Sequence, residues 1–489
     1  MKYPAYPQYK DSGVAWLGEV PGHWNVMPLK HICDVRDGTH DTPNYEIPDD
    51  NTYPLVTSKD LVLGKISLND AKHISKGDYQ LIAKRSNVSP DDILMPMIGT
   101  VGGAVIVDIE SKFAIKNVAL FKPTGRYVPR WLLFALNSEL STVQFDLEKS
   151  GGVQGFVALG TLRNLVFGVP SYEEQTAIAD FLDSETGRID TLVAKKRKLV
   201  ELLKEKRSAL ISRTVTRGLP ADVAREFGLT TGDASIHEAP ANYGRGDFNR
   251  PQDEANEFAP TGKRPSSQAF KDSGVEWLQQ IPIGWKGKSI KRIALSMICG
   301  PFGSSLTKDK YCEHGYRVYG QEQVIPNNFS IGDYYISHEY FKEMERYEVS
   351  PGDVLVSCVG TFGKVAVVPD GIEPGIINPR LISIRPNSKL ISPDYLGLFI
   401  SSNVAYEQLS SASRGGTMDI INLGLLGNLV IALPPLPSQV AIMCYLDRET
   451  TKIDRLVAKV ETAITRLQEY RSALITAAVT GKIDVREAL

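Results

Sequence analysis

The sequence has few cysteines, no long hydrophobic run and almost no net charge. Its five cysteines form no Cys-x-x-Cys pair among 489 residues, which argues against a disulfide framework and against a zinc site. The most apolar stretch, residues 93–107, is interrupted by proline and glycine and is shorter than the roughly 20 residues that a membrane span needs. Because no apolar signal core follows Met1, the sequence predicts a cytoplasmic protein.

The formal net charge of −2 excludes a uniformly basic surface, so any contact with nucleic acid must come from local patches. One such patch is 195–217, where nine basic residues accompany two acidic ones. Lys196 and Arg197 stand in its densest part and are candidates for contact with DNA phosphates. A solvated helix face explains the same run equally well.

Catalytic motifs are also scarce. The sequence has no Gly-x-x-x-x-Gly-Lys-Ser/Thr phosphate loop, no Asn-Pro-Pro-Tyr of an adenine methyltransferase and no histidine cluster at metal spacing. Only Asp91, Glu110 and Lys112 fit the Pro-Asp…Glu-x-Lys spacing with which many nucleases hold magnesium. In the second copy of the repeat described next, Gly352 stands in place of Asp91, which favours a turn over a nuclease site. We therefore expect a binding protein that is not an enzyme and has no metal or cofactor of its own.

An internal repeat organises the chain. Residues 9–24 return as 270–285 with 9 of 16 positions identical, including Lys-Asp-Ser-Gly-Val and two tryptophans. Residues 170–219 return as 434–483 with 23 of 50 positions identical. Between these blocks, both copies contain Ser-Pro-Asp/Gly-Asp-Ile/Val-Leu followed by Gly-Thr-x-Gly. Three blocks in one order at nearly one offset indicate a duplication.

Each copy has two parts of different character. About 170 residues with short Val- and Ile-rich runs between glycines and prolines predict a β-rich mixed domain. After them, 176–215 has no proline, one glycine and apolar residues at heptad spacing, which predicts a helix of about 60 Å. The predicted fold class is therefore α+β, with two β-rich globular domains separated by a two-helix antiparallel coiled coil and related by an internal pseudo-two-fold repeat.

The heptad assignment identifies the residues expected to face the partner helix. They are apolar and recur every seven residues, or at three- to four-residue steps, in both copies. The set is Leu182, Ile189, Leu192, Leu203 and Leu210 in the first helix and Leu446, Ile453, Leu456, Leu467 and Leu474 in the second. The alternative is that each helix packs on its own globular domain.

Composition and repeat together predict the boundaries. The stretch between the copies is mildly acidic, with little apolar periodicity, and predicts an extended connector on the surface. The predicted parts are a first globular domain (1–170), a first long helix (171–219), the connector (220–265), a second globular domain (266–433) and a second long helix (434–489).

With the repeat in place, the chain resembles the specificity subunits of type I restriction–modification enzymes. The resemblance depends on the duplicated Lys-Asp-Ser-Gly-Val-x-Trp-Leu opening, the Gly-Thr-x-Gly block and the Arg-Ser-Ala-Leu-Ile element at 207–211 and 471–475. It covers nearly the whole chain except the connector. The length of that connector departs from the family pattern and leaves its path open.

The resemblance implies two target-recognition domains, each of which reads one half of a gapped, asymmetric sequence in double-stranded DNA. It further implies that the spacer helices dock two methyltransferase subunits and that restriction subunits complete the complex, in defence against foreign DNA. In that family the specificity subunit is not catalytic. S-adenosylmethionine, ATP and Mg²⁺ are then expected in the partner subunits.

Base-reading residues are expected in polar loops of each domain, because polar side chains pair with base edges and glycine permits close approach to phosphate. The candidates are Gly38, Thr39, His40, Ser58, Lys59 and Thr100 in the first copy and Phe302, Gly303, Ser304, Gln321 and Thr361 in the second. Ordinary turn chemistry is the alternative at each position. The competing function is a coiled-coil scaffold that links proteins without reading DNA.

Overall fold

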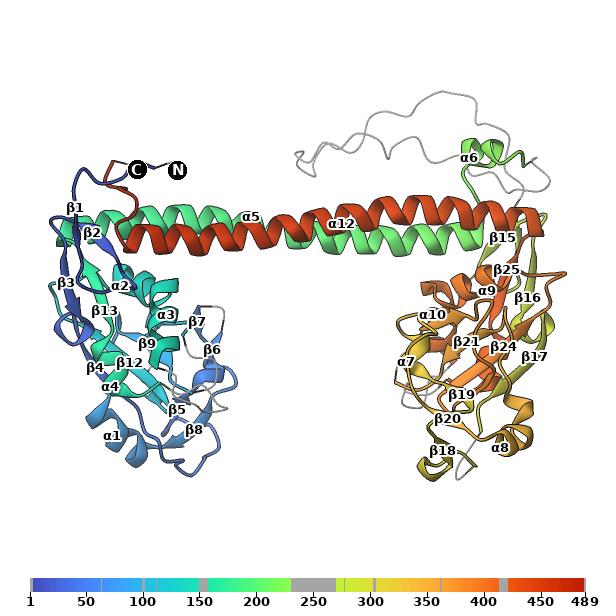
Figure 1. Ribbon diagram of the computed structural model, residues 1–489, viewed down its shortest axis with the longest axis horizontal. Coiled ribbons are helices and arrows are strands. Elements are labelled where there is room, and N and C mark those ends of the chain that lie inside the picture. The colour runs from blue at the N-terminus through green and yellow to red at the C-terminus, as the bar shows by residue number, and fades with distance from the viewer. Residues whose placement is uncertain are drawn as a thin grey trace. The chain divides into compact units, whose positions relative to one another are not determined.

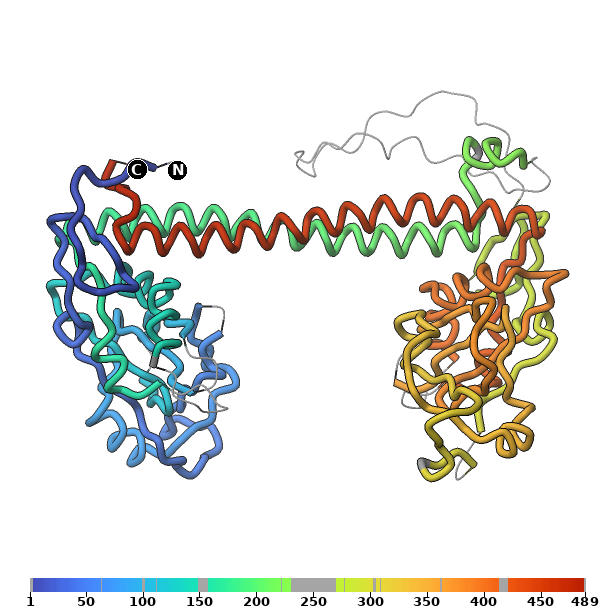
Figure 2. Tube along the Cα trace, in the orientation of Figure 1, coloured from blue at the N-terminus to red at the C-terminus, as the bar shows by residue number. Residues whose placement is uncertain are grey.

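The computed structural model describes residues 3–62, 64–98, 102–110, 112–148, 157–229, 270–276, 278–301, 305–360, 363–412 and 421–487. The chain divides into two compact units, the first formed by Met1–Lys198 with Val460–Leu489 and the second by Leu199–Lys459 (Figures 1 and 2). The division passes through two long helices, α5 (Tyr172–Arg217) and α12 (Leu436–Val479). Each unit therefore contains part of both helices.

The first unit is built on two small sheets. The strands of these sheets are β4 Cys33–Asp37, β5 Thr52–Val56, β8 Lys72–Ser75, β9 Ile93–Pro96, β10 Val105–Ile106, β11 Ala114–Ile115 and β12 Val118–Pro123. One sheet is antiparallel with the order β10-β9-β12-β4. The other has the order β11-β5-β8, in which β11 runs parallel to β5.

Short hairpins and helices complete the first unit. The remaining strands are β1 Tyr9–Asp11, β2 Glu19–Pro21, β3 Asn25–Pro28, β6 Leu61–Val62, β7 Lys65–Ile66 and β13 Val166–Val169. The helices are α1 Lys76–Arg85, α2 Pro129–Leu136, α3 Glu139–Glu148 and α4 Leu159–Asn164. A Ser75 side-chain cap starts α1, and Pro129 starts α2, as their residue types favour.

The second unit has the corresponding sheets. Their strands are β17 Ala294–Cys299, β18 Tyr311–Cys312, β19 Tyr316–Tyr319, β20 Tyr335–Ile336, β21 Val354–Ser357, β22 Val365–Val367, β23 Gly375–Ile377 and β24 Leu381–Pro386. The orders are β22-β21-β24-β17 and β18-β20-β19-β23, with β19 and β23 parallel. Apart from the added β18, these orders repeat those of the first unit strand for strand.

The remaining elements of the second unit follow the same plan. The strands are β14 Phe270–Asp272, β15 Gln280–Pro282, β16 Lys286–Ser289 and β25 Val430–Leu433. The helices are α6 Ala221–Glu226, α7 Gln321–Val324, α8 His338–Glu343, α9 Pro393–Ile400, α10 Asn403–Ala412 and α11 Leu423–Asn428. The predicted mixture of helix and sheet is thus confirmed in both units.

The duplicated Asp-Ser-Gly-Val motif has a structural role. In the first unit it forms the turn between β1 and β2, where the Asp11 carboxylate accepts a bond from the Gly13 amide (3.0 Å). In the second unit Asp272 accepts the equivalent bond from Gly274 (2.9 Å). Both glycines have φ near +70°, a conformation that a side chain disfavours. The motif is repeated because both units need the same turn.

Each unit buries its own hydrophobic core. The core of the first unit contains Trp24 and Trp131, and that of the second contains Trp285 and Tyr395. Both cores extend into the long helices. The most buried helix residues at these junctions include Leu182, Ile189 and Leu474 in the first unit and Leu446 in the second. The globular part and the helix ends of a unit therefore fold as one body.

Within each unit, the segments of α5 and α12 lie side by side and run in opposite directions (Figure 1). In the first unit Asp190 forms an ion pair with Arg471 (2.9 Å), and in the second Arg207 forms one with Asp454 (2.9 Å). The two pairs are copies of each other at the 264-residue offset of the repeat. All four side chains are about one third to one half exposed, so each pair contributes at most about 1 kcal/mol to stability.

The buried stripe of the helices differs from the predicted heptads at two of ten positions. Leu182, Ile189, Leu446, Ile453 and Leu474 are buried, and Leu203, Leu210 and Leu467 are half-buried. Leu192 and Leu456 are instead 43% and 49% exposed, so their placement in the seam is wrong. Their neighbours Val193 and Val457 are less exposed. Each valine follows a buried isoleucine, Ile189 or Ile453, by four positions, and residues four positions apart lie on the same face of a helix.

The start of the predicted connector also differs from an extended chain. Helix α6 occupies its first residues, and Val223 and Ala224 are buried in the core of the second unit. Both apolar side chains pack on this core, which explains why the chain is helical here. The rest of the connector, 230–265, lies outside the described residues. No helix in the described part of the chain has the length and apolar composition of a membrane span.

Candidate nucleic-acid interface

In the first unit, loops that follow four strands converge. Thr39, after β4, forms an isolated bridge with Lys116, which follows β11. The Lys116 amide donates to the carbonyl of Val56, the last residue of β5 (2.9 Å). The Met97 amide, after β9, donates to the Asn117 carbonyl (3.2 Å). Backbone bonds thus hold the four loops as one platform.

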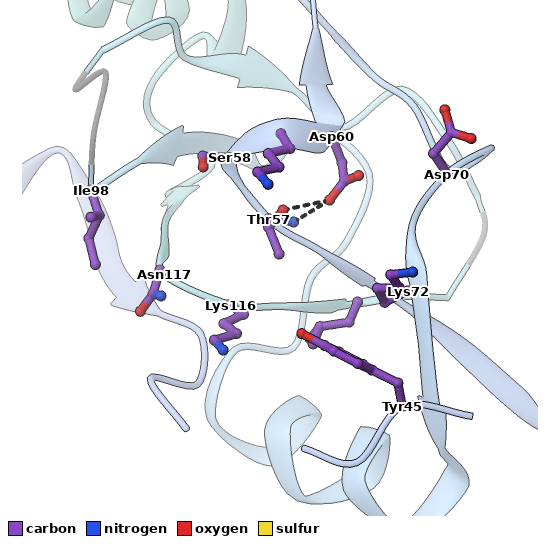
Figure 3. A pocket seen from close by; sticks show the side chains of 11 residues that line it. Tyr45, Thr57, Ser58, Asp60, Asp70, Lys72, Ile98, Lys116 and Asn117 are labelled. Atoms are coloured by element: carbon purple, nitrogen blue, oxygen red, sulfur yellow. Dashed lines mark hydrogen bonds between the residues drawn. The ribbon is translucent and has the colours of Figure 1, made fainter. Parts of the chain in front are cut away.

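The platform borders a pocket of about 490 Å³ (Figure 3). Lys59, Lys72 and Lys116 line it together with two carboxylates, those of Asp60 and Asp70. The apolar part of the lining comes from side chains such as Ile98 and the exposed ring of Tyr45. A concave site with three ammonium groups suits a negatively charged ligand.

The lysines of this pocket are not neutralised by ion pairs. Asp60 is committed to its own turn, because its carboxylate accepts bonds from the amide (2.7 Å) and hydroxyl (2.8 Å) of Thr57. Over the part of the chain that the structure describes, no carboxylate forms an ion pair with Lys59, Lys72 or Lys116. The Lys116 ammonium donates to the Thr42 hydroxyl, and an ammonium group has two further donors.

His40 supports the platform. Its two ring nitrogens lie 2.9 Å from the Asn117 side-chain oxygen and 3.0 Å from a carboxylate oxygen of Asp37. Asp37 is buried and also pairs with Arg85. The predicted residue His40 therefore ties the loop after β4 to the loop after β11. Its contacts are those of a positioning residue.

The second unit builds the same platform with different side chains. The Asn378 amide donates to the Tyr319 carbonyl (2.8 Å), and the Cys358 amide donates to the Arg380 carbonyl (3.0 Å). Gln321 donates from its amide to the Ser357 hydroxyl (2.6 Å) and the Val359 carbonyl (2.5 Å). Its side chain therefore holds α7 against the loop after β21.

Burial keeps the floor of this second platform uncharged. Burial raises the pKa of Tyr319 to about 12, and burial also raises the pKa of Cys358 to about 11. Both groups are therefore protonated at neutral pH. The charge that a ligand meets there comes from rim residues such as Glu322 and Arg380, which are exposed.

Gly38 is required by the packing of the platform. A Cβ atom at Gly38 would lie closer than 3.0 Å to the carbonyl oxygen of Ile115, and one at Gly300 would meet the carbonyl oxygen of Asn378 in the same way. The two glycines occupy equivalent positions, since each donates its amide to the first residue of the following central strand, Val118 or Leu381. Glycine at this position is therefore explained by its close approach to the protein's own backbone, whereas the expected approach to a DNA phosphate stays a prediction.

The family of the chain follows from a comparison with known domains. A family model described as "Type I restriction modification DNA specificity domain" matches residues 21–202 and 282–466. The chain belongs to this family. The two matches fall on the two copies of the repeat, so the specificity chain carries the domain twice.

Relatives and solved structures agree with this assignment. The EcoBI specificity subunit of Escherichia coli is 22% identical over 439 residues, which cover 88% of this chain and 80% of that protein. The StySPI specificity subunit of Salmonella potsdam is 31% identical over 180 residues, 34% of this chain and 38% of that one. A chain from a structure of the complex assembly and conformational transition of a type I system covers 94% of this specificity chain and 98% of its own length, at 16% identity and a TM-score of 0.59. This last likeness shows the shared fold.

The structure places the predicted DNA-contact residues in four groups, one of which is Gln321 in α7 of the second unit. Ser58 and Lys59 line the pocket, and Gly38, Thr39 and His40 form the platform beside it. Lys196 is half-buried and Arg197 exposed on α5, and neither lines the pocket. Outside the described residues lie Thr100, Phe302, Gly303, Ser304 and Thr361.

The nuclease pattern is explained by a turn. Asp91 has a positive φ of +67°, and Gly352 at the equivalent position has a positive φ of +83°. The side chain that holds the turn is that of the neighbouring Asp92, which accepts a hydrogen bond from the Ser89 amide (2.8 Å). Glu110 and Lys112 are exposed. Among the residues that the structure describes, no group of three or more His, Cys, Asp or Glu could hold a metal ion. The pattern therefore needs no catalytic role.

Sequence reasoning missed Lys72, Lys116 and Asn117. Lys72 joins Ser58 and Lys59 through the antiparallel pairing of β8 with β5. Lys116 and Asn117 lie almost 60 residues further along the chain and join them through the parallel pairing of β11 with β5. The repeat contained a signal for these residues. In each copy a short apolar pair, Ala114-Ile115 or Ile376-Ile377, is followed by a polar residue. An alignment of these pairs would have pointed to Lys116 and Asn378.

Proposed function

We propose that this specificity chain is a non-catalytic recognition subunit whose two units read the unlike halves of a gapped, asymmetric sequence in double-stranded DNA. The observation that carries the proposal is one strand order with two sets of side chains. At equivalent positions of the platform, the first unit has Lys59, Lys72 and Lys116, and the second has Glu322, Tyr334 and Asn378. One scaffold with different side chains at its loop ends suits two readers of different sequences.

The proposal assigns the long helices the role of a spacer. Helices of 46 and 44 residues extend about 65–70 Å, more than one turn of B-DNA at about 34–36 Å. The recognition domains would then be 1–170 and 266–433, the spacer helices 171–219 and 434–489, and the connector 220–265. The two ion pairs that repeat at the 264-residue offset support an antiparallel coiled coil with a pseudo-two-fold axis.

The same helices would dock two methyltransferase subunits. Their outer faces carry leucines that are 43–49% exposed: Leu192, Leu199, Leu202 and Leu456. Exposed leucines in a row along a helix are typical of a surface that a partner covers. Restriction subunits would join through the methyltransferases, and S-adenosylmethionine, ATP and Mg²⁺ would be bound by these partners. The whole complex would act on DNA in the cytoplasm.

Substitution of the exposed leucines should separate assembly from folding. The change Leu192→Asp together with Leu456→Asp is expected to weaken binding of the methyltransferase subunit about tenfold or more, because it places charge at the centre of the contact. The melting temperature should stay close to that of the native chain, since both side chains are exposed. Titration of the purified chain with its methyltransferase subunit measures the first effect.

Val193→Asp is the matched control, because Val193 is buried beside Leu192. It should lower the melting temperature. Methyltransferase binding that is unchanged in the double leucine variant would show that the subunit docks elsewhere.

The recognition role is tested by mapping modified bases in the genome of cells that contain this chain with its methyltransferase and restriction partners. We expect one bipartite motif with two unlike halves and a fixed gap. A scaffold that does not read DNA gives no motif that depends on this chain. Deletion of the chain is the control, and it should abolish modification at every site of the motif.

A further inference from the structure

Lys116 is held more firmly than the other lysines of the pocket. Its amide bonds to the Val56 carbonyl, and its backbone bridges to Thr39, so the start of the side chain is fixed on the platform. The next residue, Asn117, has φ +54° and donates its amide to the Thr39 carbonyl (3.1 Å), which closes the turn. The side chain of Lys116 is half-buried.

Lys59 and Lys72 stand differently. Both are exposed, and neither forms an ion pair with any described residue. Lys59 lies in the short 3₁₀ turn Ser58–Asp60 after β5, and Lys72 is the first residue of β8. Exposed lysines on flexible stems act as point charges and suit phosphate groups, whose contact needs no fixed geometry.

We propose that Lys116 reads a guanine in the half-site bound by the first unit, while Lys59 and Lys72 contact the flanking phosphates. This inference rests on the proposed recognition function and assigns its residues. A lysine ammonium is only a donor, and guanine presents two adjacent acceptors, N7 and O6, in the major groove. The firm backbone around Lys116 gives the fixed position that base readout requires.

The second unit supports the assignment by contrast. Asn378 is the first residue after β23, as Lys116 is after β11, and both donate their amides to the last residue of the neighbouring parallel strand. The Asn378 side-chain oxygen accepts a bond from the Arg380 amide (2.9 Å) and the side chain is uncharged. The equivalent positions therefore offer a ligand different hydrogen-bonding groups, as two readers of different sequences require.

The test measures binding of the assembled complex, with its methyltransferase subunits, to a randomised DNA duplex library at several salt concentrations. In Lys116→Ala, preference for guanine at one base pair of one half-site should fall about 5- to 150-fold, and the other half-site should keep its preferences. In Lys116→Gln, the preferred base at that position should change from guanine to adenine. This gain of a new preference also shows that the variant is folded.

Lys59→Ala is the matched control from the rim of the same pocket. It should weaken binding to all sequences alike and lower the slope of log affinity against log salt by about one, because phosphate contacts carry no sequence information. If both Lys116 variants behave like Lys59→Ala, or bind every sequence as the native complex does, the base-reading role is refuted. If the native complex itself enriches no motif, the recognition function fails instead.

Discussion

Insertion of four residues into both long helices is expected to lengthen the gap in the recognised DNA sequence by one to two base pairs. The insertions are placed after Lys198 in α5 and after Thr462 in α12. Eight residues separate each insertion point from the ion pair Asp190–Arg471, so the two insertions lie at the same level of the antiparallel helices. Four helical residues add about 6 Å and a rotation of about 40° beyond a full turn. The added length of about 6 Å equals the rise of nearly two base pairs of B-DNA, and the added rotation of about 40° equals the twist of about one base pair. Both half-sequences should stay the same while the native target is lost.

The control for this experiment is an insertion of four residues in α5 alone. It shifts the second part of α5 by about one turn against α12, which removes the contact of Arg207 with Asp454 and displaces the apolar side chains around it. The melting temperature should therefore fall, whereas the paired insertion should preserve it. Mapping of modified bases gives the gap length. A paired-insertion chain that keeps the native gap would refute the spacer role.

Gly38→Ala is expected to destabilise the first unit by about 3 kcal/mol. Its Cβ would lie closer than 3.0 Å to the Ile115 carbonyl, and a backbone atom within a sheet cannot move aside as a flexible side chain can. The substitution would displace the backbone that bonds Gly38 to Val118 and Thr39 to Ile115. Chemical denaturation followed by circular dichroism measures the loss. Gly300→Ala should have the same effect on the second unit.

Gly160→Ala provides the comparison. Gly160 lies in helix α4 with no atom near its missing Cβ, so alanine should be neutral or stabilise the helix by up to about 1 kcal/mol. Equal stability of the Gly38 and Gly160 variants would show that the backbone of the platform can move to accept a side chain at Gly38. A destabilised Gly38 variant should also lose recognition of one half-site first, because the glycine belongs to the platform that borders the pocket of the first unit.

The sequence was sufficient for two mixed domains and two long helices because the repeat is visible in identical residues. Identical positions in nearly half of 170–219 locate two equivalent helices, and breaks at glycine and proline separate them from β-rich parts. It was not sufficient for the seam of the helices. In both copies a leucine precedes a valine, Leu192 before Val193 and Leu456 before Val457, so hydrophobicity favoured the wrong member of each pair. In the structure the valines are the less exposed members, with Val193 buried and Val457 half-buried.

The candidate site was predictable only in part for a similar reason. Ser58 and Lys59 were found because they stand in a polar loop, but Lys116 follows a strand of two residues that periodicity cannot detect. Its place in the pocket depends on a parallel pairing between segments about 60 residues apart. Gly38 was found for its residue type, but its close contact with the Ile115 backbone depends on the pairing of distant segments and could not be predicted from the sequence.

The composition of the first unit sets an order of events during translation. Its core includes Leu474, Ile483 and Val485, whereas the second unit is one continuous segment from Leu199 to Lys459. The half of the protein that leaves the ribosome first is therefore the last to complete its core, after the second unit has been made in full. A premature stop codon beyond Lys459 would spare the second unit and leave the amino-terminal half unfinished, a target for cellular proteases.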